Sequence, residues 1–392
     1  LFSKMSMKIS ILGSTGSIGK TLLNIIEKDK KNIEVFLLTA NKDYLTLLNQ
    51  AKKFKTKNLI ITDKKSYEIL KEKTKRLNIN VFNDFKNLKK IFKKNKIDYT
   101  MSAITGLDGL RPTFKMIKFT RRIAIANKES IICAWSIIKE ELKINKTLFI
   151  PVDSEHFSIW HSLKNKSNKK IDKIFLTASG GPLLNIALKN FKNIKISQAL
   201  KHPNWKMGKK ISIDSATMMN KVFEVIEANK IFEISYKKIS ILTQPSSYIH
   251  ALIKFDNGMT DIIAHDTTMK IPIFNTLYFD TENKLKTKNI SINKLNNLNL
   301  NLIDIKRFPS VKIIDLLIDK ETLFETVIVS ANDQLVNLFL ENKIRFIDIS
   351  RILINFLKKK EFLKYKKIKP ISIESIENLS KDVRLKITSL SV

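Results

Sequence analysis

The chain has 392 residues, of which 43% are hydrophobic and 28% charged, and this balance is typical of a globular protein, not a disordered one. Its length exceeds one typical core and predicts two or three domains. The formal net charge is +34, but only eight of the 71 basic residues are arginine, and the lysines are spread along the chain without a nucleic-acid-binding motif. We interpret the charge as solvated surface and expect no nucleic-acid partner.

Two features bear on the compartment. Cys133 is the only cysteine, which excludes an intrachain disulfide and favours a reducing compartment. No stretch approaches the roughly 18 uninterrupted apolar residues of a membrane span, and the opening "LFSKMSMKIS" lacks an apolar signal core. We expect a cytoplasmic protein without a membrane partner.

The first part of the chain alternates strands with helices. "MKISILGSTGSIGKTLLNIIEK" predicts a strand, a glycine turn and an amphipathic helix. Further strands are predicted in "IEVFLLTA", "NLIITD", "NINVF", "IDYTMSAI", "RRIAIAN" and "TLFIPVD", separated by lysine-rich helices. This order predicts an α/β fold with a doubly wound, Rossmann-like domain over residues 7–152.

A glycine-rich loop follows the first predicted strand. Gly13, Gly16 and Gly19 form G-x-x-G-x-x-G, a variant of the dinucleotide fingerprint that lets backbone N–H groups approach a pyrophosphate. A plain tight turn is the alternative. After the second strand no acid stands where NAD enzymes bind the ribose 2′-hydroxyl, and Lys42 could neutralise a 2′-phosphate. The loop therefore favours NADPH, although Asp43 beside Lys42 works against that preference.

Two polar groups follow later strands of this domain. "IANKES" places Asn127, Lys128 and Glu129 at a strand's carboxyl end, as a ligand site or as a simple helix start. "PVDSEHFSIW" carries Asp153 and Glu155, which would share a face in extended backbone. Such a pair is either a solvated acidic turn or a site for a divalent cation.

Residues 153–280 change to mixed strands and helices and predict a central α+β catalytic domain. In "LTASGGP", Ser179 begins a turn that can bind an anion or act only as a loop. His202 and Trp205 lie in "HPNWKMG", either as a lid over a ligand or as a loop anchor. We expect a linker over 281–310 and a C-terminal helical domain over 311–392, where apolar residues recur at helical spacing.

The segment "DSATMMNKVFEVIEANK" predicts a helix with a polar side. Asn220, Lys221 and Glu224 group there, and Ser215 is expected at the helix start as an N-cap or anion ligand. A lysine–glutamate pair of this kind is often only a surface salt bridge. Joined to Asp153 and Glu155, however, Glu224 would complete three carboxylates for a hard divalent ion.

These motifs occur together, in this order, in one family. "LGSTGSIG", "IANKES", "PVDSEH", "ASGGP", "HPNW.MG" and "DSATMMNK..E" make the chain resemble the 1-deoxy-D-xylulose 5-phosphate reductoisomerases over nearly its whole length. The resemblance implies NADPH- and metal-dependent conversion of 1-deoxy-D-xylulose 5-phosphate to 2-C-methyl-D-erythritol 4-phosphate for isoprenoid synthesis. It implies Mg²⁺ or Mn²⁺, with Co²⁺ as a further candidate, a small phosphorylated sugar as substrate, and a homodimer.

The resemblance also assigns roles to individual residues. Lys128, Asp153, Glu155, His202 and Glu224 would be catalytic, and Asp153, Glu155 and Glu224 would bind the metal ion. The substrate would contact Ser154, Ser179, His202, Trp205, Ser215, Asn220 and Lys221. NADPH would contact Thr15, Gly16, Ser17, Ile18, Ala40, Asn41, Lys42, Asn127, Glu129 and Gly208.

The chain departs from the family pattern at several positions. Val222 replaces a common glycine, Asn41-Lys42-Asp43 replaces Gly-Lys-Asn, and Gln244-Pro245-Ser246 replaces His-Pro-Gln. "HDTTMKIPI" also lacks the usual Pro-Asp-Met. Two alternatives remain: an inactive relative kept for binding, or a related dinucleotide-dependent oxidoreductase acting on another phosphorylated polyol. The first predicts loss of a metal or lysine residue and the second a changed substrate cluster, and the sequence shows neither.

Overall fold

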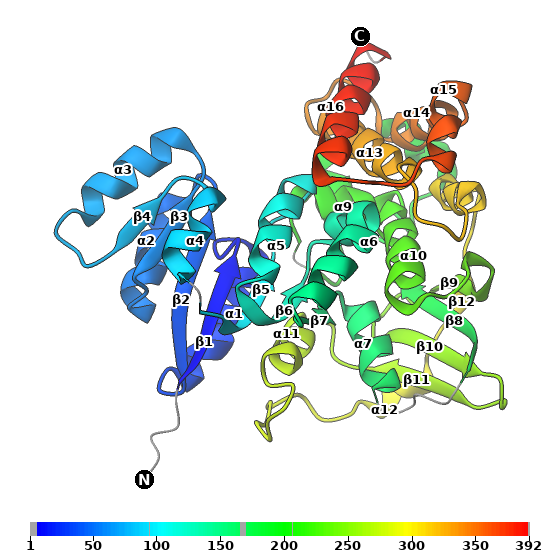
Figure 1. Cartoon of the computed structure of the whole chain (residues 1–392). Coiled ribbons are helices and arrows are strands. Elements are labelled where there is room, and N and C mark those ends of the chain that lie inside the picture. The colour runs from blue at the N-terminus through cyan, green and yellow to red at the C-terminus, as the bar shows by residue number, and fades with distance from the viewer. Residues whose placement is uncertain (1–5, 94, 165–169, 206, 391–392) are drawn as a thin grey trace. The chain divides into compact units, whose positions relative to one another are not determined.

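The computed structural model describes residues 6–93, 95–164, 170–205 and 207–390. The chain groups into two compact units (Figure 1). The first comprises Leu1–Ser130, Ile138–Asp153 and Met269–Leu285, and the second Ile131–Ile137, Ser154–Thr268 and Lys286–Val392. Residues 269–280 thus group with the first unit, whereas the sequence analysis predicts them in the central α+β domain. The three-domain division by function stays a prediction.

The first unit contains a seven-stranded sheet whose strands pair in parallel, in the order β4-β3-β2-β1-β5-β6-β7. Strand order reverses beside β1, as in a doubly wound sheet, so the predicted Rossmann-like fold is confirmed. The strands are β1 (Met7–Leu12), β2 (Ile33–Ala40), β3 (Asn58–Ile61), β4 (Asn80–Phe82), β5 (Ile97–Ser102), β6 (Thr120–Ile125) and β7 (Leu148–Pro151).

Amphipathic helices connect these strands. In α1 the apolar residues Leu22, Leu23, Ile25 and Ile26 are buried, as their spacing predicts. They join the side chains of β1 and β2 in one hydrophobic core. The helices of this unit are α1 (Ser17–Ile26), α2 (Tyr44–Phe54), α3 (Lys64–Thr74), α4 (Leu88–Phe92), α5 (Leu110–Ile117) and α11 (Lys270–Leu277), together with both ends of α6 (Lys128–Ile144).

The second unit contains a five-stranded mixed sheet in the order β11-β10-β8-β9-β12. Only β8 and β9 pair in parallel, and the other neighbours are antiparallel. The strands are β8 (Ile171–Ala178), β9 (Ile239–Thr243), β10 (Ile249–Phe255), β11 (Thr260–Ala264) and β12 (Asn301–Leu302). Because β12 comes from residues 281–310 and pairs with β9, the segment expected as a plain linker also forms a sheet edge.

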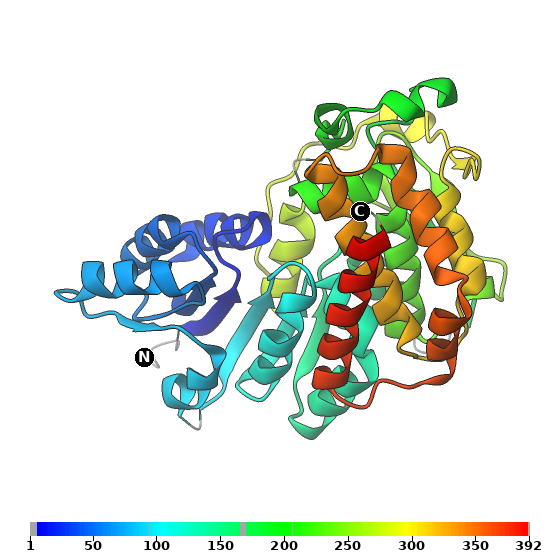
Figure 2. The same ribbon diagram turned by 90° about the horizontal axis from the view of Figure 1, so that it is seen from above.

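Helices make up the rest of this unit. At the C-terminal end α13, α14 and α16 pack together, which confirms the predicted helical region (Figures 1 and 2). Among the described residues, no helix is both long and apolar enough to cross a bilayer. The helices are α7 (Ser154–Leu163), α8 (Ile196–Leu200), α9 (Lys209–Ala216), α10 (Met219–Phe232), α12 (Ile292–Asn296), α13 (Phe324–Leu340), α14 (Phe346–Leu357), α15 (Lys360–Leu363) and α16 (Ile373–Leu390).

Candidate active site

The glycine loop lies between β1 and α1. Gly13 has φ +80°, and a Cβ added there would lie 2.8 Å from the Ala103 carbonyl oxygen. A Cβ on Gly19 would lie 2.5 Å from the Ser14 Cα, so α1 packs too closely on the loop for any larger residue. No side chain caps this helix, and its first N–H groups lack intrahelical acceptors. The N-terminus of α1 is therefore suited to an anion.

The loop after β2 is held by side-chain hydrogen bonds. Asn41 Nδ2 donates to Thr62 Oγ1 at 2.8 Å, and Ser66 Oγ donates to the Lys42 carbonyl at 2.9 Å. Asp43 caps α2 by accepting from Thr46 N at 3.1 Å. Asp43 therefore has a structural role as the N-cap of α2, next to the exposed Lys42.

The side chain of Asn127 caps a helix. Its Oδ1 accepts from Ser130 N at 2.8 Å and caps α6, while its Nδ2 donates to the Gly106 carbonyl at 2.8 Å. The helix-start interpretation of "IANKES" is therefore correct, and the buried Glu129 lies in the same first turn. Lys128, next to this cap, donates from Nζ to Asp153 Oδ2 at 2.9 Å. The ligand-site interpretation of the motif stays a prediction.

The acidic pair does not lie in extended backbone. Helix α7 begins at Ser154, so Glu155 sits in a first helical turn and the predicted strand-like sharing of a face is wrong. Ser154 Oγ donates to Glu155 Oε2 at 2.6 Å. Asp153 directly precedes this helix, and only Ser154 separates the two acids along the chain. Asp153 therefore lies just before α7 along the chain, and Glu155 lies in the first turn of that helix.

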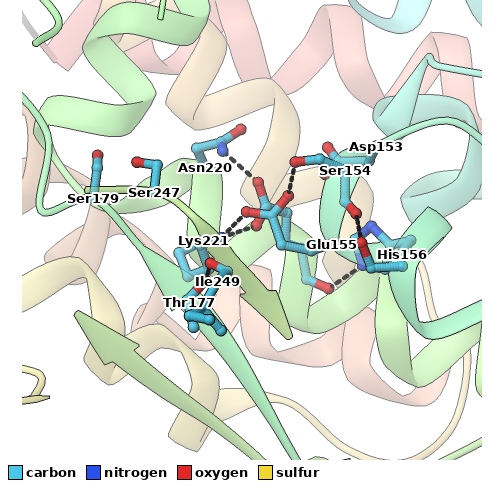
Figure 3. A network of polar contacts seen from close by, with 12 residues as sticks. Asp153, Ser154, Glu155, His156, Thr177, Ser179, Asn220, Lys221, Ser247 and Ile249 are labelled. Carbon is cyan, nitrogen blue, oxygen red and sulfur yellow. Dashed lines mark hydrogen bonds and ion pairs between the residues drawn. The ribbon is translucent and has the colours of Figure 1, made fainter. Parts of the chain in front are cut away.

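Helix α10 brings its polar side to Glu155. Lys221 donates from Nζ to Glu155 Oε1 at 2.6 Å and also to Glu224, while Asn220 donates to Glu224 (Figure 3). The side chains of Lys221 and Glu224 are only 4% and 2% exposed. The predicted grouping is confirmed, but this is no surface salt bridge. Carboxylate oxygens of Glu155 and Glu224 lie within 4.8 Å of each other, with the ammonium group bonded to both residues.

The charge of Lys221 is fixed by its partners. Burial alone lowers the pKa of this ammonium, but the carboxylates of Glu155 and Glu224 outweigh that effect and raise the pKa above its usual value. Lys221 is therefore charged throughout the range in which proteins are stable. It holds together two carboxylates that would otherwise repel each other.

Ser215 is not at a helix start. It lies in the last turn of α9, which ends at Ala216, and α10 begins three residues later at Met219. Met218 between them adopts a left-handed conformation with φ +69° and forms the N-cap of α10 without a side-chain bond. The N-cap prediction for Ser215 is therefore wrong, because the helix it was assigned to is broken at this junction.

Ser179 and His202 form a second polar group. His202 Nδ1 accepts hydrogen bonds from Asn204 N at 3.1 Å and Trp205 N at 3.0 Å, so in the neutral ring Nε2 carries the proton. Nε2 lies 3.1 Å from Ser179 Oγ, which also accepts from Gly181 N at 3.0 Å. Since Ser179 Oγ then accepts two bonds, its own proton is left to donate outward. Burial lowers the pKa of His202 to about 4, so this arrangement persists at neutral pH.

At several positions where the chain departs from the family pattern, the residues present make local contacts that accommodate them. Gln244 accepts from Tyr248 N at 2.9 Å and donates to the Leu298 carbonyl at 3.0 Å, so its buried amide is bonded on both sides. Val222 is fully buried within α10. In place of the usual Pro-Asp-Met segment, His265 stacks on His250 with ring centroids 3.6 Å apart.

The sequence analysis did not predict the buried polar contacts made by α9 next to Ser215. The preceding residue, Asp214, is buried and accepts from Asn332 Nδ2 at 2.7 Å. Lys210 Nζ lies 3.1 Å from Asp214 Oδ2 and 2.9 Å from Asp333 Oδ1, joining α9 to α13. The available signal was the polar pair Asn332-Asp333 between the apolar stretches of α13, a pattern that indicates a buried polar contact.

The fold and these groups define a class of protein. A parallel α/β sheet with a glycine loop at an uncapped helix is a dinucleotide-binding fold, and the buried carboxylates suit a cation. Family models for 1-deoxy-D-xylulose 5-phosphate reductoisomerase match residues 9–135, and those for its C-terminal domains match 149–232 and 266–386.

Individual relatives agree. The reductoisomerase of Pelagibacter ubique (strain HTCC1062) is 58% identical over 98% of this chain and 100% of its own length. The Zymomonas mobilis enzyme, solved in complex with NADPH, is 31% identical with a TM-score of 0.86 over 99% of both chains. A reductoisomerase structure with NADPH, fosmidomycin and magnesium is 29% identical with a TM-score of 0.90 over 98% of both chains. The chain belongs to the 1-deoxy-D-xylulose 5-phosphate reductoisomerase family.

Proposed function

We propose that this chain uses NADPH and a divalent metal ion to convert 1-deoxy-D-xylulose 5-phosphate to 2-C-methyl-D-erythritol 4-phosphate in isoprenoid biosynthesis. Membership of the family supports this activity. The observation within the molecule that carries it is the buried contact of Lys221 with Glu155 and Glu224. An inactive relative would be expected to have lost one of the carboxylates or the lysine, and all of them are present.

NADPH is proposed to bind in the first unit. The uncapped N-terminus of α1 offers N–H groups around Thr15, Gly16, Ser17 and Ile18 to the pyrophosphate. Ala40, Asn41 and Lys42 follow β2, where the adenosine ribose of a dinucleotide binds in such folds. Asn127 and Glu129 of the first unit, and Gly208 of the second unit, are proposed to complete the set. Of these, Asn127 has its side chain engaged at the α6 cap, so its backbone is left for the cofactor.

The metal ion is proposed to be held by Asp153, Glu155 and Glu224. The donor set fits Mg²⁺ or Mn²⁺, because these ions prefer carboxylate oxygens, and Co²⁺ is a further candidate. The position of the Lys221 ammonium against two of the carboxylates supports a site that accepts positive charge. When bound, such an ion polarises the ketone and hydroxyl oxygens of a substrate and lowers the barrier to rearrangement.

The remaining residues are proposed to bind and orient the substrate. Ser179 is proposed to donate its hydroxyl proton to the anionic phosphate, since its oxygen already accepts from Gly181 N and lies 3.1 Å from His202 Nε2. Ser215, Asn220 and Lys221 are proposed to contact the same phosphate. Ser154 and Lys128 are proposed to contact the other substrate oxygens, and Trp205 is proposed to close over the site from the His202 loop. Reduction then follows by hydride transfer from NADPH.

The test is an assay of NADPH oxidation with 1-deoxy-D-xylulose 5-phosphate and added Mn²⁺. Substrate-dependent oxidation that requires the metal supports the proposal. Oxidation with another phosphorylated polyol only would favour the related oxidoreductase, and NADPH binding without any turnover would favour the inactive relative. Omission of substrate and chelation of the metal are the controls.

A change at Lys42 should alter the cofactor preference. The wild-type protein should favour NADPH over NADH, since Lys42 is exposed beside the expected 2′-phosphate. Lys42→Glu should remove or reverse this preference, about a tenfold or larger change, because a carboxylate repels the phosphate and accepts a ribose hydroxyl. Steady-state kcat/KM with both cofactors measures it. Lys57→Glu, on the same unit, is the charge-matched control, and equal efficiency with both cofactors in the wild type would contradict the assignment.

A homodimer in the cytoplasm is also proposed. The single buried cysteine is consistent with a reducing compartment. Strand β11 is at a sheet edge and turns Ile262 outward with 50% of its surface exposed, which suits pairing with a second copy. Light scattering at micromolar concentration should give twice the chain mass of 45.3 kDa, and Ile262→Lys should shift it toward monomer. A wild-type monomer would refute the dimer, and a dimeric variant would refute this edge as its interface.

A further inference from the structure

A glutamine lies on the apolar side of α2. Gln50 is 9% exposed and is surrounded along the helix by the buried residues Leu47, Leu48 and Ala51. A buried amide in such a place costs free energy unless both its donor and its acceptor are bonded. Its partners therefore indicate why a glutamine stands there.

Both ends of the amide bond to one residue of the glycine loop. Ser14 Oγ donates to Gln50 Oε1 at 2.8 Å, and Gln50 Nε2 donates to the Ser14 carbonyl at 2.9 Å. Ser14 is fully buried and lies 36 residues away in sequence. A single side chain thus fixes the side chain and the backbone of Ser14 at the same time.

Thr39 at the end of β2 completes the arrangement. Gly13 N donates to Thr39 Oγ1 at 2.9 Å, and Ser14 N donates to the Thr39 carbonyl at 2.9 Å. The first two residues of the loop are thereby bonded to α2 and β2. The next residues lead directly into the uncapped N-terminus of α1, so their direction is set by this attachment.

We propose that Gln50 is a positioning residue for NADPH, which holds the glycine loop in the conformation that receives the pyrophosphate. A glycine-rich loop has high conformational freedom, and a loop ordered in advance loses less entropy when the cofactor binds. Gln50 itself touches the loop and not the cofactor. This inference rests on the proposed use of NADPH.

The experiment compares NADPH affinity in three variants by fluorescence titration. Gln50→Leu keeps the size and removes both bonds, and it should raise the NADPH Kd about tenfold, a loss of about 1.4 kcal/mol. Ser14→Ala removes the hydroxyl contacts with Gln50 Oε1 and, at 3.2 Å, with the Thr39 carbonyl, leaves the bond from Gln50 Nε2 to the Ser14 carbonyl, and should raise the Kd about threefold. The control is Thr74→Val in α3 of the same unit, since Thr74 is equally buried and donates to the Leu70 carbonyl at 2.9 Å, away from the loop.

The pattern of kinetic constants separates positioning from general destabilisation. In Gln50→Leu the KM for NADPH should rise while the KM for 1-deoxy-D-xylulose 5-phosphate stays within about twofold, and Thr74→Val should lower the unfolding temperature without changing either constant. An NADPH Kd within twofold of wild type in Gln50→Leu would overturn the inference. If that variant does not fold, an unchanged Kd in Ser14→Ala would overturn it. A wild type that does not bind NADPH would instead refute the proposed function.

Discussion

Replacing Glu224 with glutamine should reduce metal-dependent turnover by at least about 100-fold, because even changes outside the direct ligands cost 10- to 100-fold in metal affinity or activity. The substitution keeps the size of the side chain and removes one of three proposed anionic ligands. NADPH affinity should remain near the wild-type value, since the glycine loop belongs to the other unit. Mn²⁺ titrations of turnover and NADPH titrations of fluorescence measure the two effects separately.

Glu227 provides a matched control on the same helix. It is buried one turn after Glu224, and its Oε2 lies 3.7 Å from His156 Nδ1. Glu227→Gln should leave the Mn²⁺ requirement within a few-fold of wild type, whereas Asp153→Asn and Glu155→Gln should behave like Glu224→Gln. If Glu227→Gln were the damaging change and Glu224→Gln were harmless, the ion would belong to the His156–Glu227 group. Loss of NADPH binding in all variants would mean that the carboxylates support the fold.

Lys221→Met should destabilise the metal-free protein by about 3–5 kcal/mol, the usual effect of removing one partner of a buried ion pair. Glu155 and Glu224 would then share a buried space without the ammonium, and their mutual repulsion would raise their pKa values. The loss of stability should therefore be greatest above neutral pH and should diminish as the pH falls and a carboxyl group takes up a proton. Mn²⁺ should restore part of the stability at neutral pH, because it replaces the missing positive charge.

Urea unfolding at pH 7.5 and pH 5.5, with and without Mn²⁺, measures this prediction. Lys53→Met is the control, because Lys53 pairs with Glu27 at 2.8 Å on the surface and such pairs contribute about 0–1 kcal/mol. A midpoint for Lys221→Met that matches wild type in the absence of metal would contradict the expected role of the ammonium. Stability that rises with pH would contradict the predicted repulsion.

The parts of the site that follow from local sequence were predictable. Gly13 and Gly19 are required by close contacts within a strand-loop-helix unit, and the alternation of apolar residues around them already indicated that unit. Asn220 and Glu224 share a helical face because they are four residues apart, which fixes their spacing independently of the remaining fold. Local sequence pattern therefore located both the glycine loop and one of the three carboxylates, Glu224.

Contacts between distant segments could not be derived from local pattern, and only the family resemblance assigned Glu224, Asp153 and Glu155 to one site. Lys221 and Glu155 are 66 residues apart, and nothing in either segment records that the ammonium lies against both carboxylates. The start of α7 at Ser154 follows Pro151 too closely for sequence pattern to separate a turn from continued strand. The left-handed conformation of Met218, which ends one helix and begins the next, could not be predicted either, because methionine has no preference for that conformation.

That left-handed junction sets a limit on how the chain can change in length. Only Thr217 and Met218 separate α9 from α10, so the connection between Ser215 and Lys221 is too short to accommodate a change in length. One residue inserted in the first turn of α10 would rotate all that follows by about 100°, given 3.6 residues per turn, and would carry Lys221 and Glu224 away from Glu155. Substitutions at the junction can be absorbed by the surrounding core. Insertions and deletions cannot be absorbed in this way. Homologues should therefore differ in the identity of the junction residues but not in their number.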